Sequence, residues 1–254
     1  MHMTDQVLNL RDRSGVRIVT LNRPDALNAF TTQLWDDLRD ALMAASADDS
    51  VKCVVLTGSG RAFTSGQDLN QMLEPDHDAD PMASGYPAFM PALEAFDKPL
   101  IAAVNGVAVG IGMTILGFCD LVFIARSARM RVPFSALGVT TEAAASYLLP
   151  LRMGWQNAAY AIFTSDWLDA EQAVASGLAL RVVDDVDLMD QTLQVADQIA
   201  TFGVNSLRTS KRLMMAAHRT EIERARTDEL EAFTGLIGTE ENLAAITAFF
   251  ARRG

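Results

Sequence analysis

The sequence predicts an α/β fold, and three features support this prediction. A strand-like run, Val16–Leu21, is followed by the helical pattern of Thr31–Ala47 and by a second strand-like run, Val51–Thr57. This order is typical of a parallel, right-handed crossover. Leu100–Val104 is uniformly apolar, as expected for a buried strand. From Leu188 onward the apolar spacing is almost wholly helical.

The chain is predicted to open with a hairpin. Its strands are Val7–Leu10 and Val16–Leu21, and its charged turn is Arg11–Gly15. Thr31–Ala47 then carries apolar side chains at helical intervals, which favours a helix packed on the sheet. The acidic, proline-containing stretch Met72–Met90 has no periodicity and is predicted to be a surface loop. A metal site within its Asp76–Asp80 segment is disfavoured, since acidic loops are usually just solvated.

The second half of the chain is predicted to be mainly helical. Ala143–Leu149, Trp155–Phe163 and Asp169–Ser176 are predicted helices, the last capped near Asp169 and stopped by Gly177. Leu180–Val183 is a short predicted strand. The remaining predicted helices are Leu188–Phe202, Ser206–His218, Ile222–Phe233 and Glu240–Ala251.

These patterns predict a core domain over residues 1–195 and a C-terminal helical extension over residues 196–254. The extension carries apolar residues that would lie on its surface unless they pack on the core or on a partner. They are Leu213, Met214, Phe233, Leu236, Phe249 and Phe250.

Composition narrows the class of protein. The 254 residues include 21 Lys and Arg against 32 Asp and Glu, a net charge of −11 that opposes binding to nucleic acid. The two cysteines, Cys53 and Cys119, lie in apolar runs that suit reduced core thiols. The uncharged run Pro99–Cys119 is broken by glycines, so it reads as core rather than as a membrane span. We expect a cytoplasmic protein that binds neither nucleic acid nor membrane.

Two glycine-bearing segments predict a site for negative charge. Asn105-Gly106 is a strong turn pair, and a helix is predicted to start near Ile111. The first N–H groups of a helix lack intrahelical partners and can bind an anion. Arg61–Leu69 likewise follows the strand-like run Lys52–Thr57. Two such loops side by side would supply the two N–H donors of an oxyanion hole.

Five motifs in fixed order resemble those of the crotonase family, the enoyl-CoA hydratases and isomerases. They are LNRPDALNAF (21–30), VVLTGSGRAFTSGQDL (54–69), KPLIAAVNGVAVGIGM (98–113), CDLVFIA (119–125) and PFSALGVTTE (133–142). The last motif and VGIGMTILGFCD look most like the Δ3,Δ2-enoyl-CoA isomerase branch. The resemblance implies a crotonase-like (ClpP/crotonase) fold of repeated ββα units and a homotrimer or hexamer assembled through the C-terminal helices.

The resemblance also implies site residues. The amides of Gln67 and Ile111 would form the oxyanion hole, with Gly110 beside them. The path of coenzyme A would be lined by Asp25, Ala26, Leu27, Ser65, Gly66, Gln67, Asp68, Leu69, Gly110 and Ile111. The alternative for Ser65–Gln67 is a simple strand-to-helix turn. The coenzyme A thioester is the substrate, and no metal or other cofactor is expected.

Departures from the family pattern indicate the reaction. The two glutamates of the hydratases are replaced by Thr114 and Phe134, neither of which can act as a carboxylate base. Glu142 falls where the isomerase branch has its catalytic glutamate. Its apolar neighbours would desolvate it and raise its pKa. The alternative for Glu142 is a helix-start glutamate favoured by the helix dipole.

The sequence therefore predicts an isomerase that converts 3-enoyl-CoA to 2-enoyl-CoA with Glu142 as its single base. Two alternatives stay open. One is a non-catalytic acyl-CoA-binding subunit, and the other is a crotonase-fold enzyme of another acyl-CoA reaction, such as a hydratase or a thioester hydrolase. A serine–histidine hydrolase is poorly supported, because no G-x-S-x-G motif occurs.

Overall fold

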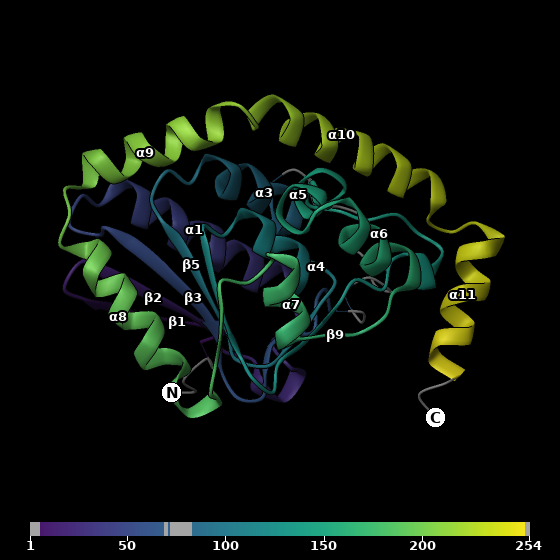
Figure 1. Cartoon of the computed structure of the whole chain (residues 1–254). Coiled ribbons are helices and arrows are strands. Elements are labelled where there is room, and N and C mark those ends of the chain that lie inside the picture. The colour runs from purple at the N-terminus through teal and green to yellow at the C-terminus, as the bar shows by residue number, and fades with distance from the viewer. Residues whose placement is uncertain (1–5, 69–70, 72–82, 252–254) are drawn as a thin grey trace, which may run out of the picture.

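A computed structural model describes residues 6–68, 71 and 83–251, and these form two sheets surrounded by helices (Figure 1). The larger sheet has the strand order β1-β2-β3-β5-β7-β10. Its strands are β1 (Leu8–Arg13), β2 (Val16–Leu21), β3 (Cys53–Gly58), β5 (Leu100–Val104), β7 (Leu121–Ala125) and β10 (Arg181–Val183). The smaller sheet has the order β4-β6-β8-β9. Its strands are β4 (Ala62–Thr64), β6 (Val107–Val109), β8 (Arg129–Arg131) and β9 (Leu168–Asp169).

Consecutive strands are divided between the two sheets in a regular way. In each of the pairs β3/β4, β5/β6 and β7/β8, the first strand joins the larger sheet and the second joins the smaller one. Strands β2, β3, β5, β7 and β10 pair in parallel, as do β4, β6 and β8. The α/β class and the repeated ββα units predicted from the sequence are confirmed. Because parallel strands end at a common edge, the loops that follow β4 and β6 are brought to one place.

The opening hairpin is confirmed, but its turn is shorter than predicted. β1 continues through Arg13 and pairs antiparallel with β2, so the turn is confined to Ser14 and Gly15, both with positive φ. The charged residues of β1 are exposed on this edge strand. A charged side chain is compatible with an edge strand because it faces water and discourages pairing with another chain.

The helices that cover the larger sheet are also close to prediction. α1 (Thr32–Ala47) begins after Thr31, whose hydroxyl accepts the Leu34 N–H (3.2 Å), and buries its apolar face.

The predicted loop from Met72 to Met90 is wrong at its end, because α3 (Gly85–Ala95) starts inside it. Proline in a first helical turn removes no hydrogen bond, so Pro87 did not prevent the helix. The Asp76–Asp80 segment lies outside the described residues.

The predicted helix near Ile111 is short. α4 (Ile111–Thr114) passes directly into the 3₁₀ turn η2 (Ile115–Phe118). Gly117 in that turn permits close packing, since an added Cβ would lie 2.9 Å from the Leu148 Cβ. Leu148 belongs to α5 (Ala145–Met153). This contact places α5 against η2, the turn that continues α4.

The other helices follow in the predicted order. They are α6 (Trp155–Thr164), α7 (Ala170–Ser176), α8 (Leu188–Ala200), α9 (Val204–Ala216), α10 (Arg219–Leu236) and α11 (Glu240–Ala251). The predicted caps of α7 are confirmed, because Asp169 forms a capping box with Gln172 and Gly177 ends the helix at positive φ. Three further 3₁₀ turns are η1 (Pro24–Ala26), η3 (Ser135–Leu137) and η4 (Asp185–Asp187).

The C-terminal helices wrap the core (Figure 1). α8 packs on the larger sheet, α9 and α10 form an arch over the helices next to it, and α11 descends at the far end of that arch. Asn242 of α11 is buried and donates to the Leu137 carbonyl (2.7 Å). The predicted domain boundary after residue 195 falls within α8, and it stays a prediction.

Large apolar side chains remain exposed on these helices. Leu213 is 66% exposed and Met214 70% exposed, and Leu236 is exposed as well, as the sequence predicted. Phe233 and Phe249 are half-buried instead. Trp155 and Phe163 of α6 add further exposed apolar surface. Within the described ranges, no helix is both long and apolar enough to span a bilayer.

Candidate active site

The two glycine-bearing loops predicted to form a donor pair lie against each other. β4 and β6 pair in parallel, and Gly66 and Gly112 follow them. A Cβ added to Gly66 would lie 2.8 Å from the Val109 carbonyl oxygen, and one added to Gly112 would lie 2.9 Å from the Thr64 carbonyl oxygen. Both separations are shorter than van der Waals contact, so the two backbones can approach this closely only with glycine at these positions.

The amides of Gln67 and Ile111 have the character expected of unused donors. Ile111 is the first residue of α4, so its N–H has no intrahelical partner. Within the described residues the structure shows no hydrogen bond from the backbone N–H of either residue. Gly110 precedes Ile111 with φ +57°, a conformation that glycine adopts without strain. Two unpaired N–H groups on adjacent loops are what a developing oxyanion requires.

The Gln67 loop is held by side-chain contacts. The Trp35 indole N–H donates to Gln67 Oε1 (2.8 Å). The Gly66 N–H donates to the hydroxyl of Thr64 (3.1 Å), and that hydroxyl donates to the Asn28 carbonyl (2.7 Å). These contacts fix the direction of the backbone at Gln67 without using its own N–H.

The two segments predicted to line the coenzyme A path are adjacent. The Ser65 N–H donates to the Leu27 carbonyl (2.9 Å), and its hydroxyl lies 3.4 Å from the Ala26 carbonyl. Asp68 forms an ion pair (3.0 Å) with Arg23, which lies two residues before Asp25. Leu27 has φ +51° and ends the 3₁₀ turn η1. Leu69 lies outside the described residues.

Glu142 stands immediately before a strained turn. Ala143 and Ala144 have φ +59° and +53°, and left-handed backbone costs a residue with a Cβ about 1–2 kcal/mol. The strain is offset by tertiary contacts. The Ala143 N–H donates to the Tyr86 hydroxyl (3.0 Å), and the Ser146 N–H donates to Glu229 Oε1 (2.7 Å). Glu142 is therefore fixed by contacts from α3 and α10 as well as by its own loop.

The environment of Glu142 makes it a stronger proton acceptor than an ordinary glutamate. Burial disfavours its charged form, and the nearby Glu229 carboxylate disfavours it further, so the pKa of Glu142 rises to about 8. The residue is half-buried, which leaves part of its side chain accessible. Burial was predicted from the apolar residues around Glu142, whereas Glu229 was not foreseen. A carboxylate with such a pKa is suited to removing a proton from carbon.

A chain of contacts connects Glu142 with the oxyanion loops. Tyr86, which accepts from Ala143, lies edge-on to Trp35 at a ring-centroid separation of 5.6 Å. Trp35 in turn binds the Gln67 side chain. The structure thus brings together residues from α1, α3, the β4 loop and the start of α5. These residues are far apart in the sequence.

The two positions at which the resemblance places the hydratase glutamates are apolar or uncharged here. Thr114 ends α4 and is fully buried, and its hydroxyl has no hydrogen-bond partner within the described part of the chain. Phe134 is buried, and its ring lies 3.9 Å from where a Cβ on Gly110 would stand. Neither side chain offers a carboxylate beside the Ile111 loop.

The sequence does not predict two residues of the site, Tyr86 and Glu229. Tyr86 lies within the stretch predicted to be a surface loop. Glu229 lies in the highly charged helix α10, where it resembles its exposed neighbours. The one available signal was spacing, because Glu229 falls seven residues after the buried Ile222 and so shares its face of the helix.

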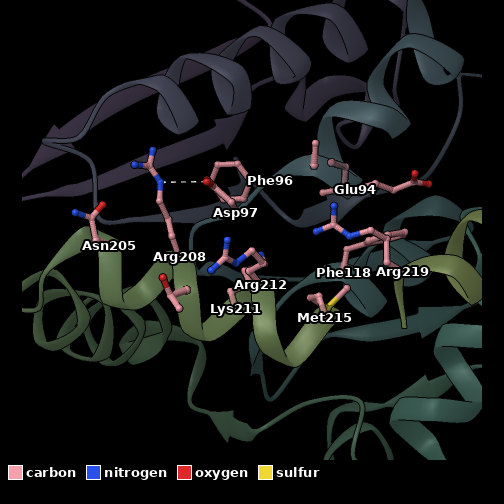
Figure 2. Close-up of a pocket in the computed structure, with 13 residues that line it drawn as sticks. Glu94, Phe96, Asp97, Phe118, Asn205, Arg208, Lys211, Arg212, Met215 and Arg219 are labelled. Atoms are coloured by element: carbon pink, nitrogen blue, oxygen red, sulfur yellow. Dashed lines mark ion pairs between the residues drawn. The ribbon is translucent and has the colours of Figure 1, made fainter. Parts of the chain in front are cut away.

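A cavity of about 480 Å³ lies apart from these residues, between α9 and the end of α3 (Figure 2). Two of its basic side chains hold α9 to the core. Arg208 pairs with Asp97 (3.1 Å), and Lys211 Nζ pairs with Asp120 Oδ2 (2.8 Å). None of the predicted site residues lines it.

Among the residues that the structure describes, no cluster of three or more histidine, cysteine, aspartate or glutamate side chains could hold a metal ion.

Comparison with known proteins decides the family. The family model described as enoyl-CoA hydratase/isomerase matches residues 11–254. The chain belongs to the enoyl-CoA hydratase/isomerase family. The resemblance read from the five motifs is therefore confirmed, and so is the crotonase fold, because a solved enoyl-CoA hydratase/isomerase from Pseudoalteromonas atlantica T6c superposes with a TM-score of 0.92. That structure is 34% identical, and the match covers 98% of each chain.

Relatives within this family differ in their reactions. The chain is 32% identical to 2,3-dehydroadipyl-CoA hydratase of Escherichia coli K12, with 99% of this chain and 97% of the relative covered. It is 33% identical to enoyl-CoA delta isomerase 2 of Rattus norvegicus, with 94% of this chain and 62% of the relative covered. Because hydratase and isomerase stand at nearly the same identity, the reaction has to be argued from the residues of the site.

Proposed function

We propose that this member of the family is an isomerase that shifts the double bond of a 3-enoyl-CoA to the conjugated 2-enoyl-CoA. The observation that carries the proposal is the distribution of carboxylates. Glu142 is held at the start of α5 with a pKa of about 8, whereas Thr114 and Phe134 replace the paired glutamates of the hydratases. A double-bond shift needs one base, and water addition in this family uses two.

The reaction would proceed through a dienolate. Glu142 takes a proton from C2 of the thioester, and the electron pair moves onto the thioester oxygen and across C3 and C4. The amides of Gln67 and Ile111 stabilise the oxygen as its negative charge grows. Glu142 then returns the proton at C4. Its high proton affinity favours the first step, because the hydrogen on C2 is weakly acidic.

Substrate binding rests on the adjoining backbone segments. Residues 25–27 and 65–68 lie side by side through the Ser65–Leu27 hydrogen bond. In this proposal they line the coenzyme A path together with Gly110 and Ile111. An acidic protein with a net charge of −11 would bind the anionic coenzyme through such local contacts rather than through its overall field.

A direct test compares two proteins on one substrate. The wild-type protein should convert a 3-enoyl-CoA to the absorbing 2-enoyl-CoA, and Glu142→Gln should abolish this turnover while acyl-CoA affinity changes little. Gln preserves the size of the side chain but cannot accept the proton. Wild-type turnover by a correctly folded Glu142→Gln protein would refute the assignment of the base.

Two alternatives have distinct outcomes in the same assays. A non-catalytic acyl-CoA-binding subunit would bind the thioester and turn over no member of a 3-enoyl-CoA panel. A hydratase or thioester hydrolase would consume crotonyl-CoA or release free coenzyme A. No residue of the described site favours these alternatives over the isomerase.

The exposed apolar side chains support an assembly. Leu213 and Met214 of α9 and Trp155 and Phe163 of α6 are large apolar side chains that lie largely exposed in the single chain. We propose a homotrimer or a hexamer, which light scattering coupled to size-exclusion chromatography would distinguish from a monomer.

A further inference from the structure

The turn after Glu142 depends on a group from a distant part of the chain. Ala143 and Ala144 are successive non-glycine residues in left-handed backbone, and α5 begins directly after them. No side chain at the start of α5 caps its free N–H groups. Glu229 of α10 fills this role from outside, because its Oε1 accepts the Ser146 N–H (2.7 Å).

Glu229 is built into this position. It is 6% exposed, in a helix whose other acidic side chains face solvent. Burial raises the pKa of Glu229, and hydrogen bonding from Ser146 offsets part of this rise. Its Oε2 is buried without a hydrogen-bond partner within the described residues. Burying a carboxylate with one oxygen unpaired lowers the stability of the fold. This cost points to a specific role for Glu229.

We propose that Glu229 is a positioning residue for Glu142: it clamps the strained turn that aims Glu142, and its negative charge strengthens Glu142 as a proton acceptor. This inference rests on the proposed function of Glu142 as the base. Glu229 itself touches no reacting atom in this account. It acts through the backbone of residues 144–146 and through its field.

Within the described part of the chain, Glu229 is the charged group that raises the pKa of Glu142. The other ionisable groups nearby are neutral or paired elsewhere. The pKa of Tyr86, from α3, is raised well above its ordinary value, chiefly by burial and then by Glu142, so the phenol stays neutral. Arg226 lies one turn before Glu229, but its Nε is paired with Glu94 Oε1 of α3 at 2.6 Å.

On α5 itself, the Tyr147 hydroxyl bonds to His218 Nδ1 (2.8 Å), at the junction of α9 and α10. The nearest 3₁₀ turn, η3, contributes Ser135, Ala136 and Leu137, which carry no charge. Because burial and Glu229 are what raise the pKa of Glu142, removal of the Glu229 charge should have a measurable effect on that pKa.

The test separates the clamp from the charge. Glu229→Gln keeps an oxygen for the Ser146 N–H but removes the charge, whereas Glu229→Ala removes both. The matched controls are Glu231→Gln and Glu231→Ala, which make the same changes at an exposed position of α10. For each protein, kcat/KM on a 3-enoyl-CoA is measured from pH 5 to pH 10, with the thermal midpoint as a check of folding.

The Gln variant should move the acidic limb of kcat/KM to lower pH by on the order of one unit, with a plateau near that of the wild type. The Ala variant should also lose at least about tenfold from its plateau kcat, because the base is no longer aimed, while KM changes little. An unmoved limb in Glu229→Gln, or an equal movement in Glu231→Gln, would overturn the inference. Should Glu229→Ala fail to fold, the Gln profile still decides.

A second readout needs no turnover. In protein labelled with ¹³C at glutamate Cδ, the Glu142 signal is assigned by its absence from Glu142→Gln. Its titration should shift to lower pH in Glu229→Gln and stay unchanged in Glu231→Gln. If Glu142→Gln keeps full activity, the proposed function fails. If Glu142→Gln is inactive but the Glu142 titration does not move, the role of Glu229 alone is wrong.

Discussion

The close approach of the two glycine loops makes Gly112→Ala the most informative single substitution. Gly112 follows Ile111, and an added Cβ would lie 2.9 Å from the backbone oxygen of Thr64 and 2.7 Å from its Cγ2. The first separation is roughly 0.5 Å shorter than ordinary contact, and backbone on both sides leaves little freedom to relax. One of the two loops must move.

The expected magnitudes follow from that displacement. Overpacking of this kind costs about 1–3 kcal/mol, which lowers the thermal midpoint by roughly 2–12 °C for a chain of this size. A shift of about half an ångström in the Ile111 amide should reduce kcat at least about tenfold, since a 1 Å error in a catalytic group can cost ~100-fold. The assay is the conversion of 3-enoyl-CoA at a temperature at which the variant is folded.

The matched control is Gly235→Ala. Gly235 lies in α10 with nothing within 4 Å of an added Cβ, so alanine should be neutral or stabilising by about 0.5–1 kcal/mol. Its activity should equal that of the wild type. A folded Gly112→Ala protein with unchanged kcat would show that the negative charge does not develop against the Ile111 loop.

Three further predictions concern the donor, the base and the C-terminal helices. Ile111→Pro removes one N–H and should lower kcat by at least about 100-fold, as measured on protein whose circular dichroism matches the wild type. Glu142 holds a proton in the folded state up to about pH 8, whereas the unfolded chain releases it near 4.5, so stability is lost as pH rises between these values. The thermal midpoint of Glu142→Gln minus that of the wild type should therefore increase from about pH 5 to pH 8. A difference that stays constant over this range would contradict the raised pKa. Lys211→Met leaves Asp120 without its 2.8 Å ion-pair partner and should destabilise the protein by about 1–3 kcal/mol in chemical unfolding, with kcat unchanged.

Local patterns in the sequence sufficed for most elements. The apolar spacing of Thr31–Ala47 and the capping hydroxyl of Thr31 define α1 without reference to the rest of the chain. The same holds for the strand Leu100–Val104 and for the capped helix α7. The length of β1 was missed because charged residues on an edge strand read as a turn.

The site was predictable where it consists of backbone. The two glycine-bearing segments predicted to lie side by side do so, and they approach most closely at Gly66 and Gly112. The clamp around Glu142 was not predictable, because Tyr86 and Glu229 lie 56 residues before and 87 residues after it. Their contacts with residues 143–146 depend on how α3 and α10 pack. The left-handed turn at Ala143-Ala144 was equally hidden, since alanine gives no signal of positive φ.

The measurement that tests the central claim most directly is a paired rate determination in deuterated water. The purified protein is given a 3-enoyl-CoA and, separately, crotonyl-CoA, and the products are followed by absorbance and mass spectrometry. We predict rapid formation of 2-enoyl-CoA with partial deuterium at C4, since the shared base exchanges its proton, and slow hydration of crotonyl-CoA. Efficient hydration of crotonyl-CoA without isomerisation of any 3-enoyl-CoA would contradict the account and return the catalytic role to other residues.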